Sequence, residues 1–89
     1  MRTLIPERTK TKISDVTTYI KEIDIQNQTS AINFYIHYDG SDDVDEVPTD
    51  NWFLLGPGAT FSRTIYTNPL WVYQESGSDQ YLNHFMIQS

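Results

Sequence analysis

Hydrophobic and polar residues alternate most regularly between positions 31 and 38 of the chain. Ile32, Phe34, Ile36 and Tyr38 alternate there with Asn33, Tyr35 and His37. Because successive side chains of a β-strand point to opposite faces, this alternation predicts a strand with one face turned toward a core.

Shorter runs of β-branched and aromatic residues extend this pattern along the chain, separated by turn residues such as Gly56-Pro57-Gly58. They predict strands over residues 17–26, 51–55, 59–66, 70–74 and 81–87. In the first of these, Ile20 falls on the face opposite to its apolar neighbours, which predicts a bulge or a strand covered on both sides. No segment has the apolar spacing of an amphipathic helix. The expected fold is all-β, a single small antiparallel β-sandwich or jelly-roll-like fold of about six to eight strands.

The first twelve residues differ from the rest of the chain in charge. They hold four of the six cations and one carboxylate, whereas the other 77 of the 89 residues hold two cations and eleven carboxylates. Leu4 and Ile5 are the apolar anchors of this segment, and Pro6 favours extended backbone. The sequence thus predicts an extended N-terminal arm over residues 1–12, followed by an acidic β-sandwich domain over residues 13–89.

Composition excludes several classes of protein. A net charge of −6 repels phosphate backbones, so we expect no nucleic-acid partner. Cysteine is absent, so neither a disulfide nor a thiolate zinc site contributes to stability. The longest apolar runs are four residues, which predicts no membrane span, and the N-terminus lacks a signal-peptide core.

An acidic loop over residues 39–51 holds half of the carboxylates of the chain. Oxygens at alternate positions are typical of calcium loops, but Val44 and Asp50 stand where an EF-hand requires Gly and Glu. We therefore expect a solvated loop and no cofactor, and the alternative is a looser cation site. The candidate ligands of that site are Asp39, Asp42, Asp43 and Asp45.

The sequence offers little catalytic chemistry. His37 and His84 are the only histidines and lack metal-ligand spacing, so we expect a surface or interface position for each. The chain has no phosphate-binding glycine motif and no nucleophile–base pattern, which predicts a protein that is not an enzyme.

From the sequence, the aromatic residues could either pack inside the fold or bind a partner. We expect Trp52 and Trp71 to pack in the core or at a sheet edge, whereas Tyr35, Tyr66 and Tyr73 are expected on the solvent face, where they would contact a partner. The segment Asn27-Gln28-Thr29 matches an N-glycosylation sequon, which we interpret as a chance match in a turn.

The order of these segments resembles a known family. The run TTYIKEIDIQNQTSAINFYIHYDG and the later LLGPGATFSRTIYTNPLWVY are similar to small β-sandwich virion proteins of tailed bacteriophages, and the likeness covers residues 13–88. The acidic loop and the aromatic C-terminal strand depart from the commoner form of the family. The resemblance implies a non-enzymatic capsid decoration or cement protein, or a tail- or fibre-associated piece. It also implies a virion location after assembly in the host cytoplasm, and a homo-oligomer such as a trimer that binds the major capsid or tail protein.

The mechanism that we expect is docking through the N-terminal arm and the sheet surface. The cations of the arm would pair with acidic groups of a neighbouring subunit, and its apolar residues would occupy a groove there. The expected partner-binding residues are Arg2, Leu4, Ile5, Arg8, Lys10, Lys12, Tyr35, Tyr66 and Tyr73. The alternative for the arm is that it adds a strand to its own sandwich.

Two other functions stay open from the sequence. One is a carbohydrate- or receptor-binding module that stacks ligands on Trp52, Trp71, Tyr35 or Tyr73 and uses the acidic loop for Ca²⁺ or for hydroxyl groups. The other is an inhibitor that mimics DNA, although the carboxylates are concentrated in one loop instead of following phosphate-like spacing.

Overall fold

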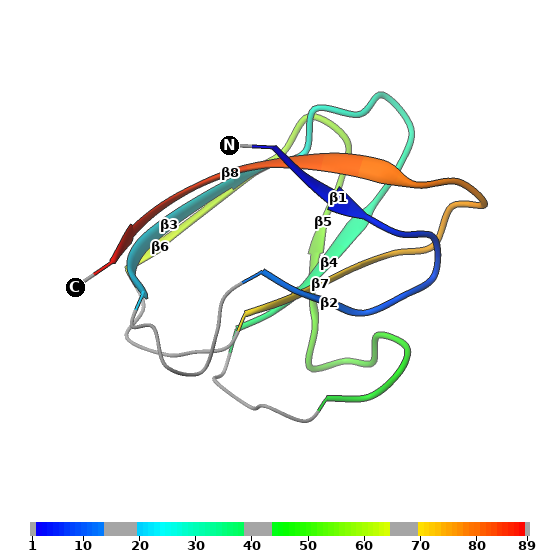
Figure 1. Cartoon of the computed structure of the whole chain (residues 1–89), viewed down its shortest axis with the longest axis horizontal. Coiled ribbons are helices and arrows are strands. Elements are labelled where there is room, and N and C mark those ends of the chain that lie inside the picture. The colour runs from blue at the N-terminus through cyan, green and yellow to red at the C-terminus, as the bar shows by residue number, and fades with distance from the viewer. Residues whose placement is uncertain (1, 14–19, 39–43, 65–69, 89) are drawn as a thin grey trace.

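The computed structural model of the chain describes residues 2–13, 20–38, 44–64 and 70–88. These residues form eight β-strands in two four-stranded sheets and contain no helix (Figure 1). The strands are β1 (Arg2–Ile5), β2 (Thr11–Lys12), β3 (Ile20–Gln26), β4 (Phe34–His37), β5 (Phe53–Leu55), β6 (Thr60–Thr64), β7 (Trp71–Gln74) and β8 (Gln80–Gln88). The prediction of a small all-β sandwich is confirmed.

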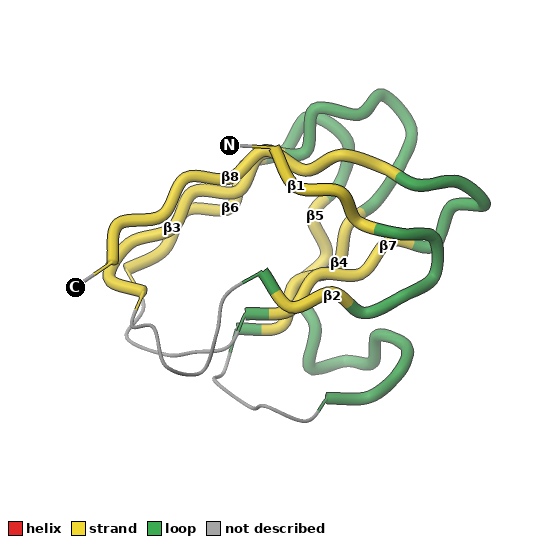
Figure 2. The backbone as a smooth tube through the Cα atoms, viewed as in Figure 1, coloured by secondary structure: helices red, strands yellow, loops and turns green. Residues whose placement is uncertain are grey.

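The strand order is that of a jelly roll. One sheet has the order β1-β8-β3-β6 and the other β2-β7-β4-β5, and every pairing is antiparallel. The first strand thus pairs with the last, the second with the seventh, the third with the sixth and the fourth with the fifth. A long antiparallel ribbon with these pairings, once it is rolled up, places β8 beside β3 and β7 beside β4. Each of these two contacts completes one of the four-stranded sheets. Figure 2 shows the two layers of strands with the loops gathered at their ends.

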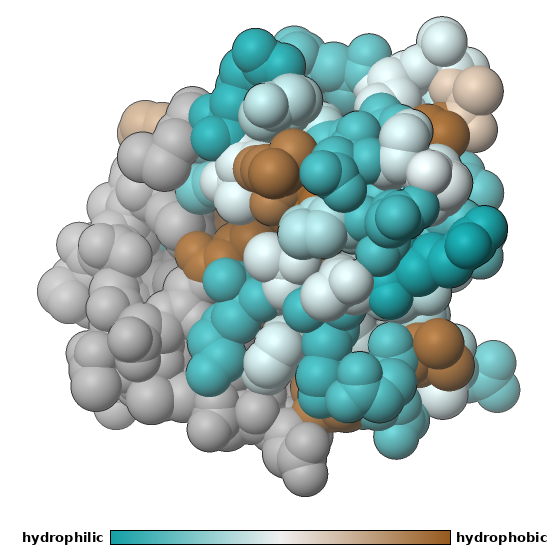
Figure 3. All heavy atoms as spheres, turned by 45° about the vertical axis from the view of Figure 1, so that its right-hand side comes forward, coloured by the Kyte–Doolittle hydropathy of each residue, from teal (hydrophilic) through white to brown (hydrophobic). Residues whose placement is uncertain are grey.

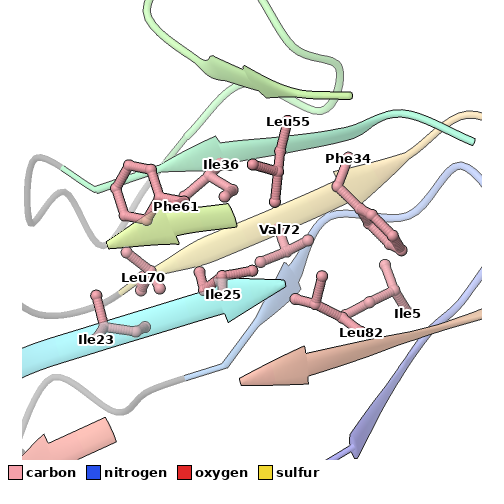
Figure 4. Close-up of a cluster of buried hydrophobic side chains, with 10 residues drawn as sticks. All are labelled: Ile5, Ile23, Ile25, Phe34, Ile36, Leu55, Phe61, Leu70, Val72 and Leu82. Atoms are coloured by element: carbon pink, nitrogen blue, oxygen red, sulfur yellow. The ribbon is translucent and has the colours of Figure 1, made fainter. Parts of the chain in front are cut away.

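A cluster of buried apolar side chains forms the core between the two sheets (Figure 4). The alternation that predicted β4 is confirmed, since Phe34 and Ile36 point inward and are fully buried. Burial of each such side chain stabilises the fold by about 1.5–3 kcal/mol. The ten buried members of this core are Ile5, Ile23, Ile25, Phe34, Ile36, Leu55, Phe61, Leu70, Val72 and Leu82.

The first twelve residues are part of the sandwich, which corrects the expectation of an extended arm that precedes the domain. β1 pairs with β8 over four residues and β2 pairs with β7 over two, so this segment contributes a strand to each sheet. Ile5 lies opposite Gln80 in this register. Its side chain is fully buried in the core cluster that also contains Leu82. The alternative of an arm that adds strands to its own fold is the one the structure supports.

The pairing of β3 with β8 contains the irregularity that the sequence predicted. Ile20 lies opposite Gln88 and Glu22 lies opposite Ile87, so the register shifts by one residue between them. The extra residue of β3 at this point is an irregularity of the kind that a β-bulge introduces.

Two buried amides hold the connections between strands. The side chain of Asn27 donates from Nδ2 to the carbonyl oxygens of Ile32 (2.7 Å) and Leu55 (3.0 Å). The backbone carbonyl of Asn27 accepts a hydrogen bond from the N–H of Gly58 (2.8 Å). Gly58 has a φ of 77°, a conformation that glycine adopts without strain, so the Gly56-Pro57-Gly58 turn can approach Asn27. Gln74 in turn donates to the carbonyls of Ile5 (3.2 Å) and Ser78 (2.8 Å). Both side chains are fully buried, which is tolerated because their polar atoms are bonded.

Candidate functional site

The expected partner-binding residues do not form one site. Lys10, Lys12, Tyr35 and Tyr73 gather at the outer face of the β2-β7-β4-β5 sheet, whereas Arg2 and Leu4 lie on the outer face of the other sheet. Ile5 belongs to the core, and its expected contact with a partner's groove is wrong. Arg8 lies in the turn between β1 and β2, where its N–H donates to the carbonyl of Gln74 (3.0 Å). Tyr66 lies outside the described residues.

The outer face of the β2-β7-β4-β5 sheet carries a second apolar cluster. Trp71 and Tyr73 of β7 pack there with Val44 and Trp52, which come from the loop between β4 and β5. Figure 1 shows this loop, in green, on the side of the sheet away from β8. The prediction that Trp52 and Trp71 pack within the fold is confirmed, since they are 7% and 8% exposed. Tyr73 is only 5% exposed because residues of the loop cover it, so its expected solvent-face position is wrong.

Tyr35 is half-buried at the edge of this cluster. Its ring meets that of Tyr73 edge-on at 6.3 Å, and its hydroxyl donates to Oε1 of Glu75 at 3.1 Å. Burial raises the pKa of Tyr35, and the hydrogen bond and the negative charge of Glu75 raise it further. This tyrosine is therefore a hydrogen-bond donor at neutral pH.

The two lysines of this face lie over Trp71. The Nζ atoms of Lys10 and Lys12 are each 5.2 Å from the ring centroid, within the range of a cation–π interaction. Lys10 also donates to the carbonyl of Val44 (2.8 Å) and lies 3.4 Å from Oε1 of Glu46, so it ties the acidic loop to the sheet. Because Glu46 is largely exposed, the ion pair itself contributes little stability.

The acidic loop is described only from residue 44 onward. Asp45 is exposed there, and Asp39, Asp42 and Asp43 lie outside the described residues. Within the described ranges, no three His, Cys, Asp or Glu side chains come together in a way that could hold a metal ion.

Both histidines are buried, which corrects the expectation of surface positions. His37 packs edge-on against Trp52 at 5.2 Å, under the loop that covers β4. His84 of β8 lies with its Nε2 atom 2.5 Å from the hydroxyl oxygen of Thr3, and burial lowers its pKa. The two histidines belong to different sheets and do not share a site.

The outer face of the β1-β8-β3-β6 sheet holds exposed aromatic residues that the sequence reasoning missed. Phe85 is 61% and Tyr81 51% exposed, and the guanidinium carbon of Arg2 lies 4.2 Å from the Tyr81 ring centroid. The alternation of residues 80–88 held the signal, because an inward Leu82 requires its neighbours at 81 and 83 to point outward.

Three shallow hollows follow one another across this outer face. The first, of about 310 Å³, lies between Arg2, Tyr81 and Asn83, and the second, of about 250 Å³, lies between Asn83, Phe85 and Asp24. The third, of about 300 Å³, begins at Asp24 and ends at Arg63. Asn83 is shared by the first two hollows and Asp24 by the last two, so the three form one continuous track.

A space-filling view shows the polar character of the described surface that it faces. Apolar atoms appear there as small separate patches among hydrophilic residues (Figure 3). The described segments contain no helix with the length and hydrophobicity that a membrane crossing requires. Comparisons of the chain with models of protein families, with curated proteins and with solved structures found no match.

Proposed function

We propose that this chain is a non-enzymatic structural protein of a bacteriophage virion, which docks on a capsid or tail assembly as a decoration, cement or accessory subunit. The sequence resemblance over residues 13–88 supports this proposal. The jelly-roll topology supports it by analogy, since viral capsid domains use this architecture repeatedly, although a fold alone does not define a function. Homo-oligomerisation, for example as a trimer, is part of the proposal.

The observation that carries the docking step is the composition of the outer face of the β2-β7-β4-β5 sheet. Lys12 lies on the edge strand β2, and Lys10 lies beside it over the same tryptophan ring. At the other edge of the sheet, Leu54 pairs with Tyr35 and is exposed on the same face. We call Lys10, Lys12, Tyr35 and Leu54 the lysine face. Two cations beside exposed apolar surface suit an acidic partner surface with an apolar centre.

The test of this proposal is a charge reversal at an exposed lysine. Lys12→Glu is expected to weaken association with purified particles by roughly tenfold at low salt. The loss should be smaller at high salt, because salt screens the attraction between exposed charges. Lys12→Arg is the matched control, since it keeps the positive charge at the same position of β2 and should retain association. Equal effects of the two variants would refute docking through the lysine face.

Truncation is not a suitable test of docking. Deleting residues 1–12 would remove β1, β2 and the buried Ile5, so loss of binding would follow from loss of the fold. Mass spectrometry of particles purified from the source of this sequence tests the virion location directly. Absence of the chain from such particles would refute the proposal, and light scattering of the isolated chain measures its oligomeric state.

The alternative of a carbohydrate module that stacks ligands on Trp52, Trp71 or Tyr73 lacks its platforms. These three rings are buried under the loop between β4 and β5, and a ligand would have to displace that loop to reach them. Any saccharide site of this chain must therefore use other residues.

A further inference from the structure

The continuous track on the outer face of the β1-β8-β3-β6 sheet has the chemistry of a ligand site that is separate from the lysine face. Its centre is set by strand register: Asn83 lies opposite Gln26, and Phe85 lies opposite Asp24 on the next outward row. Directly opposite residues of an antiparallel pair have Cβ atoms about 4.5–5.5 Å apart, so these four side chains form one compact group. It combines an exposed ring, two amides and a carboxylate.

We propose that this track binds a neutral oligosaccharide, with the ring of Phe85 as the stacking surface and Asn83, Gln26 and Asp24 as hydrogen-bonding groups. Each sugar hydroxyl is both a donor and an acceptor. An amide offers both functions from adjacent atoms, and a carboxylate accepts two bonds, so this set matches neighbouring hydroxyls of a sugar. The apolar face of a sugar ring would then cover Phe85, which is 61% exposed.

The length of the track favours an oligosaccharide over a single sugar. Tyr81 and Phe85 are four residues apart on the same face of β8, which places them about 13 Å apart along the strand. Asn83 lies between them and lines the hollow on each side. The Arg2 guanidinium covers one face of Tyr81 and holds that ring in place at the end of the track.

Other ligand classes fit this track less well. An extended peptide is bound through its backbone at a sheet edge, but β3 is an inner strand that β8 and β6 pair on both sides over residues 22–26. Of these two central strands, β3 and β8, an edge is offered only by β8 beyond Asn83, where its described pairing with β1 ends. An anionic ligand, including nucleic acid, would meet Asp24 at the centre of the track and Glu22 near it on a chain of net charge −6. The two arginines that line the track, Arg2 and Arg63, lie only at its ends. A neutral, hydroxyl-rich ligand avoids both costs.

The side chains of the track are partly ordered without a ligand. Gln28 donates from Nε2 to Oε1 of Gln26 at 3.0 Å, which turns the amide group of Gln26 toward donating from its nitrogen. Such prior ordering reduces the entropy lost on binding.

The first experiment uses the full chain with defined probes. A labelled chain is applied to an array of neutral glycans that includes cellohexaose, xylohexaose, mannohexaose and maltohexaose, and the best binder is then titrated against the ¹⁵N-labelled protein. We expect saturable binding and shifts of the side-chain amide signals of Asn83 and Gln26. Absence of saturable binding to every glycan would overturn the proposal.

Substitutions at Phe85 separate ring stacking from general hydrophobicity. Phe85→Leu is expected to weaken binding by roughly tenfold, whereas Phe85→Trp retains a ring and should retain binding. Asn83→Ala should weaken binding by roughly threefold to tenfold, the range of a lost neutral hydrogen bond. Val47→Ala removes part of a comparably exposed apolar side chain (57%) from the loop between β4 and β5, away from the track, and should leave binding unchanged.

A second copy of the chain is the other occupant that this experiment detects. If Phe85→Leu leaves glycan binding unchanged but shifts the sedimentation coefficient of the protein, the face is a contact between subunits and the saccharide proposal is wrong. Thermal unfolding of each variant confirms that it is folded, which is expected because Phe85 is exposed.

Discussion

Asn27 is a residue whose replacement we expect to damage the fold through hydrogen bonding alone. Its side chain is fully buried and makes four hydrogen bonds: Nδ2 donates to the carbonyls of Ile32 and Leu55, and Oδ1 accepts from the N–H (3.0 Å) and the hydroxyl (2.6 Å) of Thr29. One side chain thus connects the end of β3, the loop before β4 and the end of β5. The Nδ2 atom is also the atom that a glycan would modify at this sequon, so a glycosylated chain could not form this network.

The expected loss in the free energy of unfolding follows from the hydrogen bonds that Asn27→Ala removes. A neutral hydrogen bond contributes about 0.5–1.5 kcal/mol, and a buried carbonyl left without its donor costs about 1–3 kcal/mol. Asn27→Ala frees the Thr29 hydroxyl from Oδ1, and this hydroxyl lies 2.9 Å from the Ile32 carbonyl and can donate its single proton there. The largest penalty therefore falls on Leu55. We expect a loss of about 3 kcal/mol, a large part of the roughly 5–13 kcal/mol that a domain of this length has available.

The assay is urea unfolding followed by tryptophan fluorescence, because Trp52 and Trp71 are buried and report loss of packing. A loss of about 3 kcal/mol corresponds to a fall in Tm of roughly 12–24 °C for a domain of this size. Asn51→Ala is the matched control, since Asn51 is exposed and its replacement should change stability by less than about 0.5 kcal/mol. A loss at Asn27 of under about 1 kcal/mol would refute this account of the network.

Three further outcomes test other parts of the structure. Deleting residues 1–12 should unfold the chain, because it removes two strands and Ile5; a cooperative unfolding transition in the truncated protein would contradict this. Burial lowers the pKa of His84 below 6.5, so as the pH falls the unfolded chain binds a proton at this histidine before the folded chain does. The free energy of unfolding therefore falls as the pH drops below about 6.5 toward the pKa of the folded state. Urea titrations at several pH values should show a smaller fall for His84→Gln, and an unchanged dependence on pH would contradict this role of His84. Glu75→Gln should lower the pKa of Tyr35 toward 10, since it removes the negative charge that accepts the hydrogen bond of the Tyr35 hydroxyl. Alkaline titration of tyrosine absorbance should detect this change, and an unchanged titration curve would contradict the Tyr35–Glu75 hydrogen bond.

The strands of the core were predictable because one side of each is buried. Phe34 and Ile36 alternate with less apolar residues, and even the irregular register near Ile20 is visible as a break in the alternation. β1 and β2 were not predictable in this way. They are short edge strands with exposed or half-buried side chains apart from Ile5, so few of their residues carry a hydrophobic signal.

The position of the candidate surfaces was less predictable, for a different physical reason. A strand pattern indicates which residues share a face, but not whether a distant loop covers that face. Val44 and Trp52 pack over Tyr73 and turn an expected solvent face into a second apolar cluster. Among the residues that the structure describes, no loop covers Phe85 in this way, and its 61% exposure follows from the three-dimensional path of the chain instead of from its own sequence neighbours.

The jelly-roll path also changes the meaning of the charge on the first twelve residues. Four cations close together in sequence suggest one basic docking arm, but β1 and β2 belong to different sheets. Arg2 therefore lies on the face that carries Tyr81, and Lys10 and Lys12 lie on the opposite outer face beside Trp71. Because the apolar core separates these faces, a substitution at Lys12 tests protein docking and a substitution at Phe85 tests ligand binding with little coupling between them. The two proposals can accordingly fail one at a time, and a variant that removes both activities would indicate loss of the fold itself.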